Sequence, residues 1–330
     1  MPHSGVTLHD IYQARRRIAS VARRTPLVRS TWLADRAGTS VYLKLESVQE
    51  TGSFKIRGAT NKLLSLSADE RARGVITVSS GNHGRAVSYV ARQLGVDAVV
   101  CVSERVPGNK VEAIRRFGAE TVVHGRSYDE AEAHAFRLQE ERGLTWVHPF
   151  DDPFVIAGQG TIGLELLEDL PEIDTVVVPL SGGGLISGIA LALKSADPAI
   201  RVVGVSMDRA PVMVHSLRAG APIEMEEEET LADALAGGIG LDNRYTFRMV
   251  QEYVDETVLV SEEEIAGAMA GLLEKDHLVV EGGGAVGVAA LLHRRVQEIG
   301  RNVVVVLSGS NVSLPLLLEI AQKHSVCNKT

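Results

Sequence analysis

The feature that most constrains the fold is a series of short runs rich in β-branched residues, separated by longer segments with helical character. Eight runs are candidate strands, at residues 41–46, 74–79, 98–102, 120–124, 175–180, 201–206, 256–260 and 302–308. Uninterrupted valine runs followed by helices are typical of parallel strands that are covered on both faces. The sequence therefore predicts an α/β fold.

One uncharged run, VVVPLSGGGLISGIALAL at residues 176–193, is long enough to suggest a membrane span. Pro179 and three consecutive glycines interrupt it, and both residue types disfavour a single continuous helix. We interpret the run as a buried strand, a tight turn and a buried helix.

Helix starts are indicated by capping boxes, in which two side chains three positions apart satisfy free N–H groups of the first turn. Three such pairs are Thr7 with Asp10, Ser67 with Glu70 and Ser261 with Glu264. Between residues 74 and 148 the strands and helices alternate as a self-contained βαβαβα set. We expect a small α/β domain at 74–148, inserted into a large domain formed by 1–73 and 149–330.

Composition limits the partners of the chain. Its 330 residues carry a formal net charge of -8 and no basic tract, so nucleic acid is not an expected partner. Cys101 and Cys327 form neither a CxxC pair nor a disulfide framework, and no apolar N-terminal segment predicts a signal peptide. These features predict a cytoplasmic protein without membrane contact. The acidic run at 224–230 is interpreted as a solvated loop rather than a metal site.

Four turns rich in glycine or serine follow apolar runs, where open parallel sheets bind their ligands. They are SSGNHG at 79–84, SGGG at 181–184, EGGGAVG at 281–287 and SGSN at 308–311. In the SGGG turn, free N–H groups and the dipole of the following helix converge on one point, which suits a phosphate dianion. A tight turn without any ligand is the alternative explanation.

The glycines of the third turn leave a second cofactor open. Gly282, Gly284 and Gly287 match the G-x-G-x-x-G pattern of dinucleotide sites. That pattern also requires an acidic residue about 20 positions further on, at the end of the next strand. Here the next strand ends at Leu307 and Ser308, so a nicotinamide-dependent oxidoreductase is the minor alternative.

Lys55 stands between Phe54 and Ile56 in the compact segment TGSFKIRGA. Apolar surroundings disfavour an ammonium, so a lysine held there can be a neutral nucleophile near pH 7. A lysine that snorkels from a helix start is the ordinary alternative. A nucleophilic amine together with a phosphate cradle points to pyridoxal 5'-phosphate, whose aldehyde forms a Schiff base with lysine.

Four motifs together resemble one family. GSFKIRGA, SSGNHG, SGGGLISG and LSGSN occur in the order found in the fold-type II pyridoxal-phosphate enzymes, which include threonine and serine dehydratases and serine racemase. The resemblance covers nearly the whole chain. It implies two α/β domains, each with a mainly parallel sheet, the cofactor in the cleft between them, and a homodimer or higher oligomer.

The same resemblance implies a role for each site residue. Lys55 is the expected Schiff-base lysine, Phe54 packs on the cofactor ring, Asn82 binds its 3'-oxygen, Ser308 faces the pyridine nitrogen, and Glu281 lies near the cofactor. The backbone that is expected to hold the phosphate comprises Ser181, Gly182, Gly183, Gly184 and Leu185. The loop that is expected to hold the substrate carboxylate comprises Ser79, Ser80, Gly81, Asn82 and His83, with Ser80 as a second acid or base.

Two further features bear on a metal site and on the choice of substrate. Ser206 and Val212 stand where serine racemase carries acidic ligands for a divalent cation, so we expect no metal there. The segment 230–247 resembles the hydroxyectoine-utilisation dehydratases, which implies a β-hydroxy-α-amino acid of the 3-hydroxy-2,4-diaminobutyrate type, with Asp233 and Asp242 as candidate partners of the second ammonium. Threonine or serine dehydration, racemisation, and a non-catalytic phosphate-ligand sensor remain alternatives.

Overall fold

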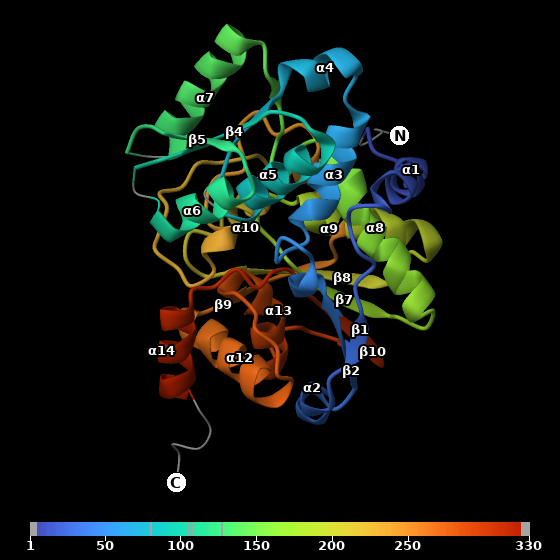
Figure 1. Cartoon of the computed structure of the whole chain (residues 1–330). Helices are drawn as coiled ribbons and strands as arrows, with labels where there is room; N and C mark the ends of the chain where they lie inside the picture. The colour runs from blue at the N-terminus through green and yellow to red at the C-terminus, as the bar shows by residue number, and fades with distance from the viewer. Residues whose placement is uncertain (1–4, 80, 105, 107, 127, 325–330) are drawn as a thin grey trace.

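The computed structural model describes residues 5–79, 81–104, 106, 108–126 and 128–324, and it contains two sheets with helices packed around them (Figure 1). The larger sheet has the order β1 (Leu27–Arg29), β2 (Ser40–Leu45), β10 (Asn302–Leu307), β7 (Thr175–Pro179), β8 (Arg201–Met207) and β9 (Glu256–Val260). The smaller sheet has the order β5 (Glu120–Val123), β4 (Ala98–Val102), β3 (Val75–Val78) and β6 (Thr145–Trp146). All strand pairs are parallel except β1 with β2.

The expected α/β fold is confirmed, and all eight candidate strands are present with ends shifted by at most one residue. The sequence patterns missed β1 and β6, which are too short to show a periodicity. The apolar run at 277–280, which precedes EGGGAVG, is not a strand. All three predicted capping boxes are formed, at the starts of α1 (Leu8–Ile18), α4 (Ala68–Arg73) and α12 (Glu262–Lys275).

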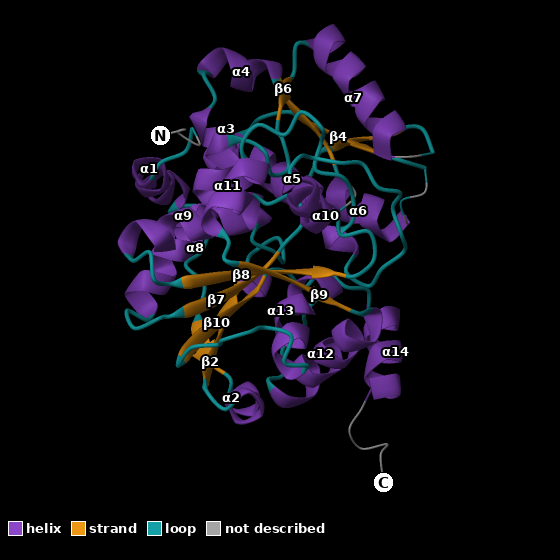
Figure 2. Cartoon of the chain, turned by 180° about the vertical axis from the view of Figure 1, so that it is seen from behind, coloured by secondary structure: helices purple, strands orange, loops and turns teal. Residues whose placement is uncertain are grey.

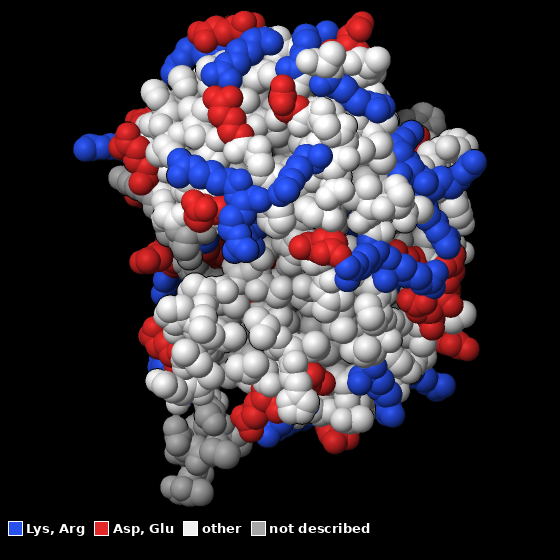
Figure 3. Space-filling model, in the orientation of Figure 1, with Lys and Arg blue, Asp and Glu red and all other residues white. Residues whose placement is uncertain are grey.

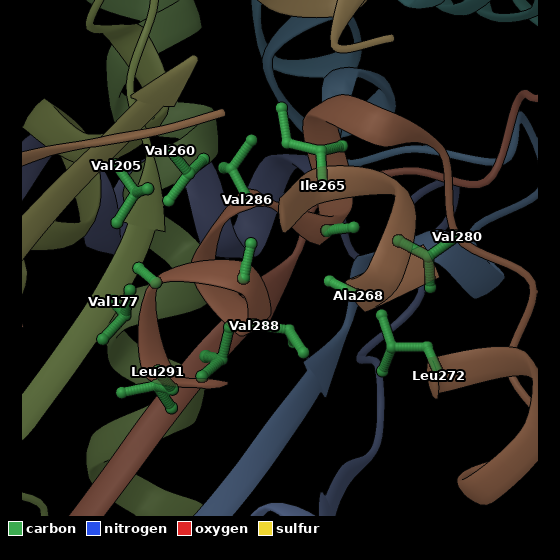
Figure 4. Packing of buried hydrophobic residues seen from close by; sticks show 14 of the residues in the cluster. Val177, Val205, Val260, Ile265, Ala268, Leu272, Val280, Val286, Val288 and Leu291 are labelled. Carbon is green, nitrogen blue, oxygen red and sulfur yellow. The ribbon is translucent and has the colours of Figure 1, made fainter. Parts of the chain in front are cut away.

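Both faces of the larger sheet are buried at its central strands, which explains why β7 and β10 are apolar along most of their length. Val177 and Val305 point to one face, against α12 and α13 (Gly282–Leu292), in the cluster shown in Figure 4. Val176 and Val304 point to the opposite face, against α8 (Pro153–Asp169) and α9 (Gly184–Ala196). Figure 2 shows these two helical layers on either side of the sheet. Successive side chains alternate in direction, so a fully covered strand needs an apolar residue at every position.

The remaining helices complete the two layers and the surroundings of the smaller sheet. They are α2 (Thr31–Ala37), α3 (Lys55–Ser65), α5 (Asn82–Leu94), α6 (Gly108–Arg116), α7 (Tyr128–Arg142), α10 (Val212–Ala219), α11 (Thr246–Tyr253) and α14 (Leu314–His324), with 3₁₀ turns η1 (Glu46–Val48) and η2 (Asp233–Leu235). No helix in these described ranges is long and apolar enough to cross a membrane. Figure 3 shows basic and acidic side chains interspersed on one face of the molecule.

Helix α3 belongs to the core of the smaller sheet although it precedes residue 74. Its residues Ile56, Ala59 and Leu63 are fully buried in the same cluster as Val75 and Val100 of that sheet. The helix also packs against α8. A boundary at 74 therefore crosses a packed core, and the division into an inserted small domain and a large domain stays a prediction.

A buried ion network fixes the other side of α3. Arg57 is 1% exposed, and its guanidinium donates to both Glu46 and Glu165 at 2.6 to 2.9 Å. The ammonium of the fully buried Lys44 lies 2.7 Å from Glu165. These contacts tie α3 to η1, β2 and α8, so the first turn of α3 is held from several directions.

Candidate active site

A cavity of about 1170 Å³ brings the sequence motifs together. Its lining includes most of the predicted site residues, namely Phe54, Lys55, Ser79, Gly81, Asn82, His83, Ser181, Gly182, Gly183, Gly184, Leu185, Asp233, Glu281 and Ser308. Asp242 is not part of the lining, and Ser80 lies outside the described residues.

The strand ends explain this convergence. The turns after β3, β7 and β10 each follow the carboxyl end of a parallel strand, as ligand-binding turns in open sheets do. The fourth turn follows no strand. It reaches the site because the backbone N–H of Glu281 donates to the carbonyl of Gly309, 3.1 Å away, next to Ser308.

Lys55 is the first residue of α3, and its side chain lines the cavity. Its Nζ donates a hydrogen bond of 2.7 Å to the carbonyl of Pro149 and lies 5.2 Å from the centre of the Phe54 ring. Burial lowers the pKa of Lys55 from 10.5 to about 8. About a tenth of the amine is therefore neutral at pH 7, and the neutral form is the one that attacks an aldehyde.

The triple-glycine turn leaves its backbone open to a ligand. Gly183 has φ +86°, a conformation that residues with a Cβ rarely adopt, and α9 begins at Gly184. A Cβ on Gly182 would collide with the ring of Phe150, and one on Gly184 would come within 2.9 Å of the Phe150 carbonyl. The first N–H groups of α9 have no partner within the helix, so they can bind a dianion at its positive end.

Asn82 and Glu281 form a buried, hydrogen-bonded pair in the cavity lining. The Nδ2 of Asn82 donates to Oε1 of Glu281 at 2.6 Å, and the two side chains belong to residues that are 8% and 4% exposed. The backbone N–H of Asn311 donates to the other carboxylate oxygen at 3.0 Å. Burial raises the pKa of Glu281 to about 7.

His83 is held as a neutral ring. Its Nε2 lies 3.1 Å from the carbonyl of Val147, and burial followed by the charge of Lys55 lowers its pKa to about 3. Ser308 is 4% exposed, and its hydroxyl lies 3.5 Å from the carbonyl of Gly283. Both side chains are therefore neutral groups at the wall of the cavity.

The two aspartates expected near a second substrate ammonium differ in position. Asp233 lines the cavity and pairs with Lys110 of α6. Asp242 is exposed and lies outside the cavity lining, so its role in substrate binding stays a prediction. Its neighbour Asn243 instead donates to the hydroxyl of Thr246 at 2.8 Å, and Thr246 packs beside Gly183. This part of the 230–247 segment supports the triple-glycine turn.

Sequence reasoning missed several residues of the site. Phe150 packs against the triple-glycine turn, and the carboxylate of Asp151 accepts the backbone N–H groups of Arg244, Tyr245 and Thr246. No local pattern predicts these two contacts. Phe150 lies about 30 positions before the glycines, and Asp151 lies about 90 positions before the N–H groups that it accepts. Asn311 was visible as the last residue of LSGSN, yet nothing in the motif shows that it contacts Asn82.

The acidic run behaves only partly as expected. Residues 221–230 form a loop without helix or strand, and Glu227 and Glu229 are exposed, but both line the edge of the cavity. Ser206 is buried, with its hydroxyl 3.4 Å from the Met207 sulfur. Within the described ranges, no three His, Cys, Asp or Glu side chains lie together as a metal-binding group.

The residues present fit pyridoxal phosphate. The triple-glycine turn lines the cavity at the start of α9, where free N–H groups suit the phosphate, and the desolvated amine of Lys55 suits the aldehyde. Both line the same cavity. Fold and site together define an α/β protein whose cavity suits a phosphorylated aldehyde cofactor.

Comparisons with known proteins identify the family. The model of the family described as pyridoxal-phosphate dependent enzyme matches residues 18–309, and the chain belongs to that family. It is 46% identical over 321 residues to an L-threonine ammonia-lyase of Thermotoga maritima, covering 97% of this chain and 79% of that one. It is 41% identical over 317 residues to the catabolic L-threonine dehydratase TdcB of Escherichia coli, covering 96% of both. The solved structure of maize serine racemase superimposes with a TM-score of 0.91 at 36% identity, covering 97% and 98% of the two chains.

These matches confirm four predictions. The chain is an enzyme, its fold is that of the fold-type II enzymes, its cofactor is pyridoxal phosphate, and it is a lyase resembling threonine dehydratases. The nicotinamide oxidoreductase and the non-catalytic sensor receive no support from the comparisons.

Proposed function

We propose that this enzyme removes water from a β-hydroxy-α-amino acid and releases a 2-keto acid and ammonia. The observation that carries the proposal is the amine of Lys55, desolvated and facing the cavity that the triple-glycine turn also lines. The names of the relatives support threonine as a substrate, since they include an L-threonine ammonia-lyase and an L-threonine dehydratase.

The residues have distinct tasks in this proposal. Lys55 holds the aldehyde, the N–H groups of residues 181–185 hold the phosphate, Phe54 packs on the ring, Asn82 donates to the ring oxygen, and Ser308 faces the ring nitrogen. The N–H groups of the turn at 79–83 bind the substrate carboxylate at the start of α5. When bound, pyridoxal phosphate supplies the electron sink that makes the Cα proton acidic.

The protein supplies the proton transfers. With the cofactor and substrate bound, the Lys55 amine would be the general base that accepts the Cα proton of the substrate. Its pKa of about 8 keeps part of it neutral at physiological pH. The β-hydroxyl then leaves with a proton, and the released enamine hydrolyses in water to the keto acid and ammonia.

A second candidate substrate is a 3-hydroxy-2,4-diaminobutyrate-type acid, as in hydroxyectoine degradation. It is favoured by the carboxylates of Glu227, Glu229 and Asp233 at the cavity lining, because these can pair with a second ammonium. Racemisation of serine or threonine is the alternative reaction on the same machinery, supported by the likeness to maize serine racemase.

A substrate panel tests the proposal. The purified enzyme with pyridoxal phosphate is supplied with L-threonine, L-serine and the diamino acid, and keto acid, ammonia and the enantiomers of the substrate are measured. Keto acid in amounts equal to ammonia is expected. Racemised substrate without keto acid would assign the alternative reaction, and no product from any of the three would reject the proposal.

Two aspartate variants separate the substrates. Asp233→Asn is expected to lower kcat/KM for the diamino acid several-fold more than for threonine, because a carboxylate of the cavity lining is lost. Asp242→Asn is made alongside it and is expected to have the smaller effect on both substrates, because Asp242 lies outside the cavity lining. Equal effects of Asp233→Asn on both substrates would reject the diamino acid as the preferred substrate.

A further inference from the structure

The amide of Asn82 lies in the middle of a chain of hydrogen bonds that begins at an arginine and ends at a carboxylate. Arg85 Nη1 donates to Asn311 Oδ1, and Asn311 Nδ2 donates to Asn82 Oδ1 at 2.6 Å. Asn82 Nδ2 in turn donates to Glu281 Oε1 at 2.6 Å. Every donor in the chain points in the same direction.

The two ends of the chain determine that direction. A guanidinium has donors only, so Asn311 must turn its carbonyl toward Arg85. The Nδ2 of Asn311 also donates to the carbonyl of Thr51 at 2.9 Å, which favours the same orientation. The carbonyl of Asn82 must then face Asn311, and its amino group must face Glu281 and the cavity. Among the described residues, one of the two N–H groups on Asn82 Nδ2 has a partner, so the second is available to a ligand.

Two glycines make room for this chain. A Cβ on Gly52, whose φ is +74°, would lie 2.6 Å from Asn311 Oδ1. A Cβ on Gly309 would collide with Glu281 Oε1 and would lie 3.3 Å from Asn82 Nδ2. The surrounding backbone is therefore shaped around these side chains, which is expected of groups whose orientation matters.

We propose that Arg85 and Asn311 are positioning residues that hold an N–H of Asn82, rather than its carbonyl, toward the 3'-oxygen of the cofactor. The inference rests on the proposed placement of Asn82 beside the cofactor ring. A flipped amide would place a carbonyl lone pair against an oxygen that is negatively charged when the cofactor is bound. The two residues thus act on the cofactor through Asn82.

The test compares affinities for pyridoxal phosphate and for its analogue without the 3-hydroxyl group. The full chain is freed of cofactor, and both dissociation constants are measured by fluorescence quenching. In the wild type, a hydrogen bond to a charged oxygen is expected to favour pyridoxal phosphate by about tenfold or more beyond the intrinsic difference between the two aldehydes. That intrinsic difference is common to all variants and cancels when their affinity ratios are compared.

Asn311→Asp is the decisive variant, because aspartate cannot donate to Asn82 Oδ1. It is expected to lower the affinity ratio by about tenfold, mainly through weaker binding of pyridoxal phosphate. Arg85→Lys keeps a donor-only cation and is expected to retain the ratio, whereas Arg85→Glu is expected to reduce it. If Asn311→Asp does not fold, the two Arg85 variants decide.

Asn61→Asp is the matched control. Arg17 donates to Asn61 Oδ1 at 2.6 Å and Asn61 Nδ2 donates to the carbonyl of Phe154 at 2.7 Å, so the same amide-to-carboxylate change is made outside the cavity lining. This variant is expected to melt at a lower temperature and to keep the wild-type ratio. A wild-type ratio in Asn311→Asp and in Arg85→Glu would overturn the inference. A wild type that binds neither aldehyde would instead reject the proposed function.

Discussion

The ammonium of Lys55 donates to the carbonyl of Pro149, and the next residue, Phe150, packs against the triple-glycine turn. Phe150 occupies the space beside Gly182 and Gly184. A two-residue segment therefore contacts both the expected attachment point of the cofactor and its expected phosphate site. The distance between the lysine and the turn is set by this segment as well as by the sheet.

Lys55→Ala is expected to abolish turnover, with a loss of at least about 1000-fold, because the attachment point and the general base disappear together. Reduction of the wild-type holoenzyme with borohydride is expected to fix the mass of the cofactor on the peptide that contains Lys55. Lys62→Ala is the control, since Lys62 is on the same helix and pairs with Asp152 outside the cavity lining. Near-normal turnover in Lys55→Ala would contradict the proposed mechanism.

Gly183→Ala is expected to weaken the binding of pyridoxal phosphate by about tenfold or more. The strain of a Cβ at positive φ costs about 1 kcal/mol, and the new methyl group would also lie 3.0 Å from Met213 and Thr246. Gly220→Ala provides the comparison, because Gly220 has φ +78° with no heavy atom within 4 Å of its Cβ position. Both variants should lose stability in urea titrations, while the affinity for the cofactor should fall only in Gly183→Ala.

The cofactor-free protein should lose stability as pH rises through about 7, in part because of Glu281. Its pKa is raised from 4.5 to about 7 by burial, so the folded protein binds this proton more tightly than the unfolded chain does between those values. The contribution is fully present below about pH 4.5 and is lost as pH rises through about 7. Glu281→Gln removes it, and its unfolding free energy relative to wild type should rise by about 2–3 kcal/mol from about pH 4.5 to pH 8. A difference that stays constant in urea titrations across this range would refute the assignment.

Ser308→Asp is expected to increase transamination at the expense of elimination. A neutral hydroxyl does not keep the ring nitrogen of the cofactor protonated, whereas a carboxylate favours the protonated ring and a stronger electron sink. Conversion of the bound cofactor to its amine form, followed by absorbance during turnover, measures the change. An unaltered ratio of keto acid to aminated cofactor would count against the proposed role of Ser308.

Arg57→Met is expected to destabilise the protein by about 3–5 kcal/mol, because Glu46 and Glu165 would remain buried without their partner. Arg15→Met removes an arginine from the exposed pair with Glu168 and should cost about 1 kcal/mol or less. Chemical denaturation of both variants distinguishes the two environments. Similar losses would show that the buried network does not hold α3 in place.

The features that could be predicted from the sequence are those that depend on residues close together in the chain. Strands such as 302–307 and helix starts such as Ser261 with Glu264 follow from neighbouring residues, so the sequence alone predicted them. The identity of the cofactor also followed from local motifs, because Lys55 and the triple-glycine turn each carry their chemistry in a few adjacent residues. The position of Asp242 outside the cavity lining could not be predicted, because its residue type does not reveal the direction in which its loop faces.

The sequence by itself determined the α/β class and the cofactor and predicted roles for Lys55 and the triple-glycine turn, since apolar periodicity and short motifs are properties of contiguous residues. Only the tertiary structure decided that Phe150 packs against the triple-glycine turn and that Arg57 holds α3 through buried carboxylates. It also decided that Arg85 and Asn311 orient Asn82. These contacts join residues that are far apart in the chain. Their geometry exists only after the sheets and helices have packed together, so no local pattern encodes it.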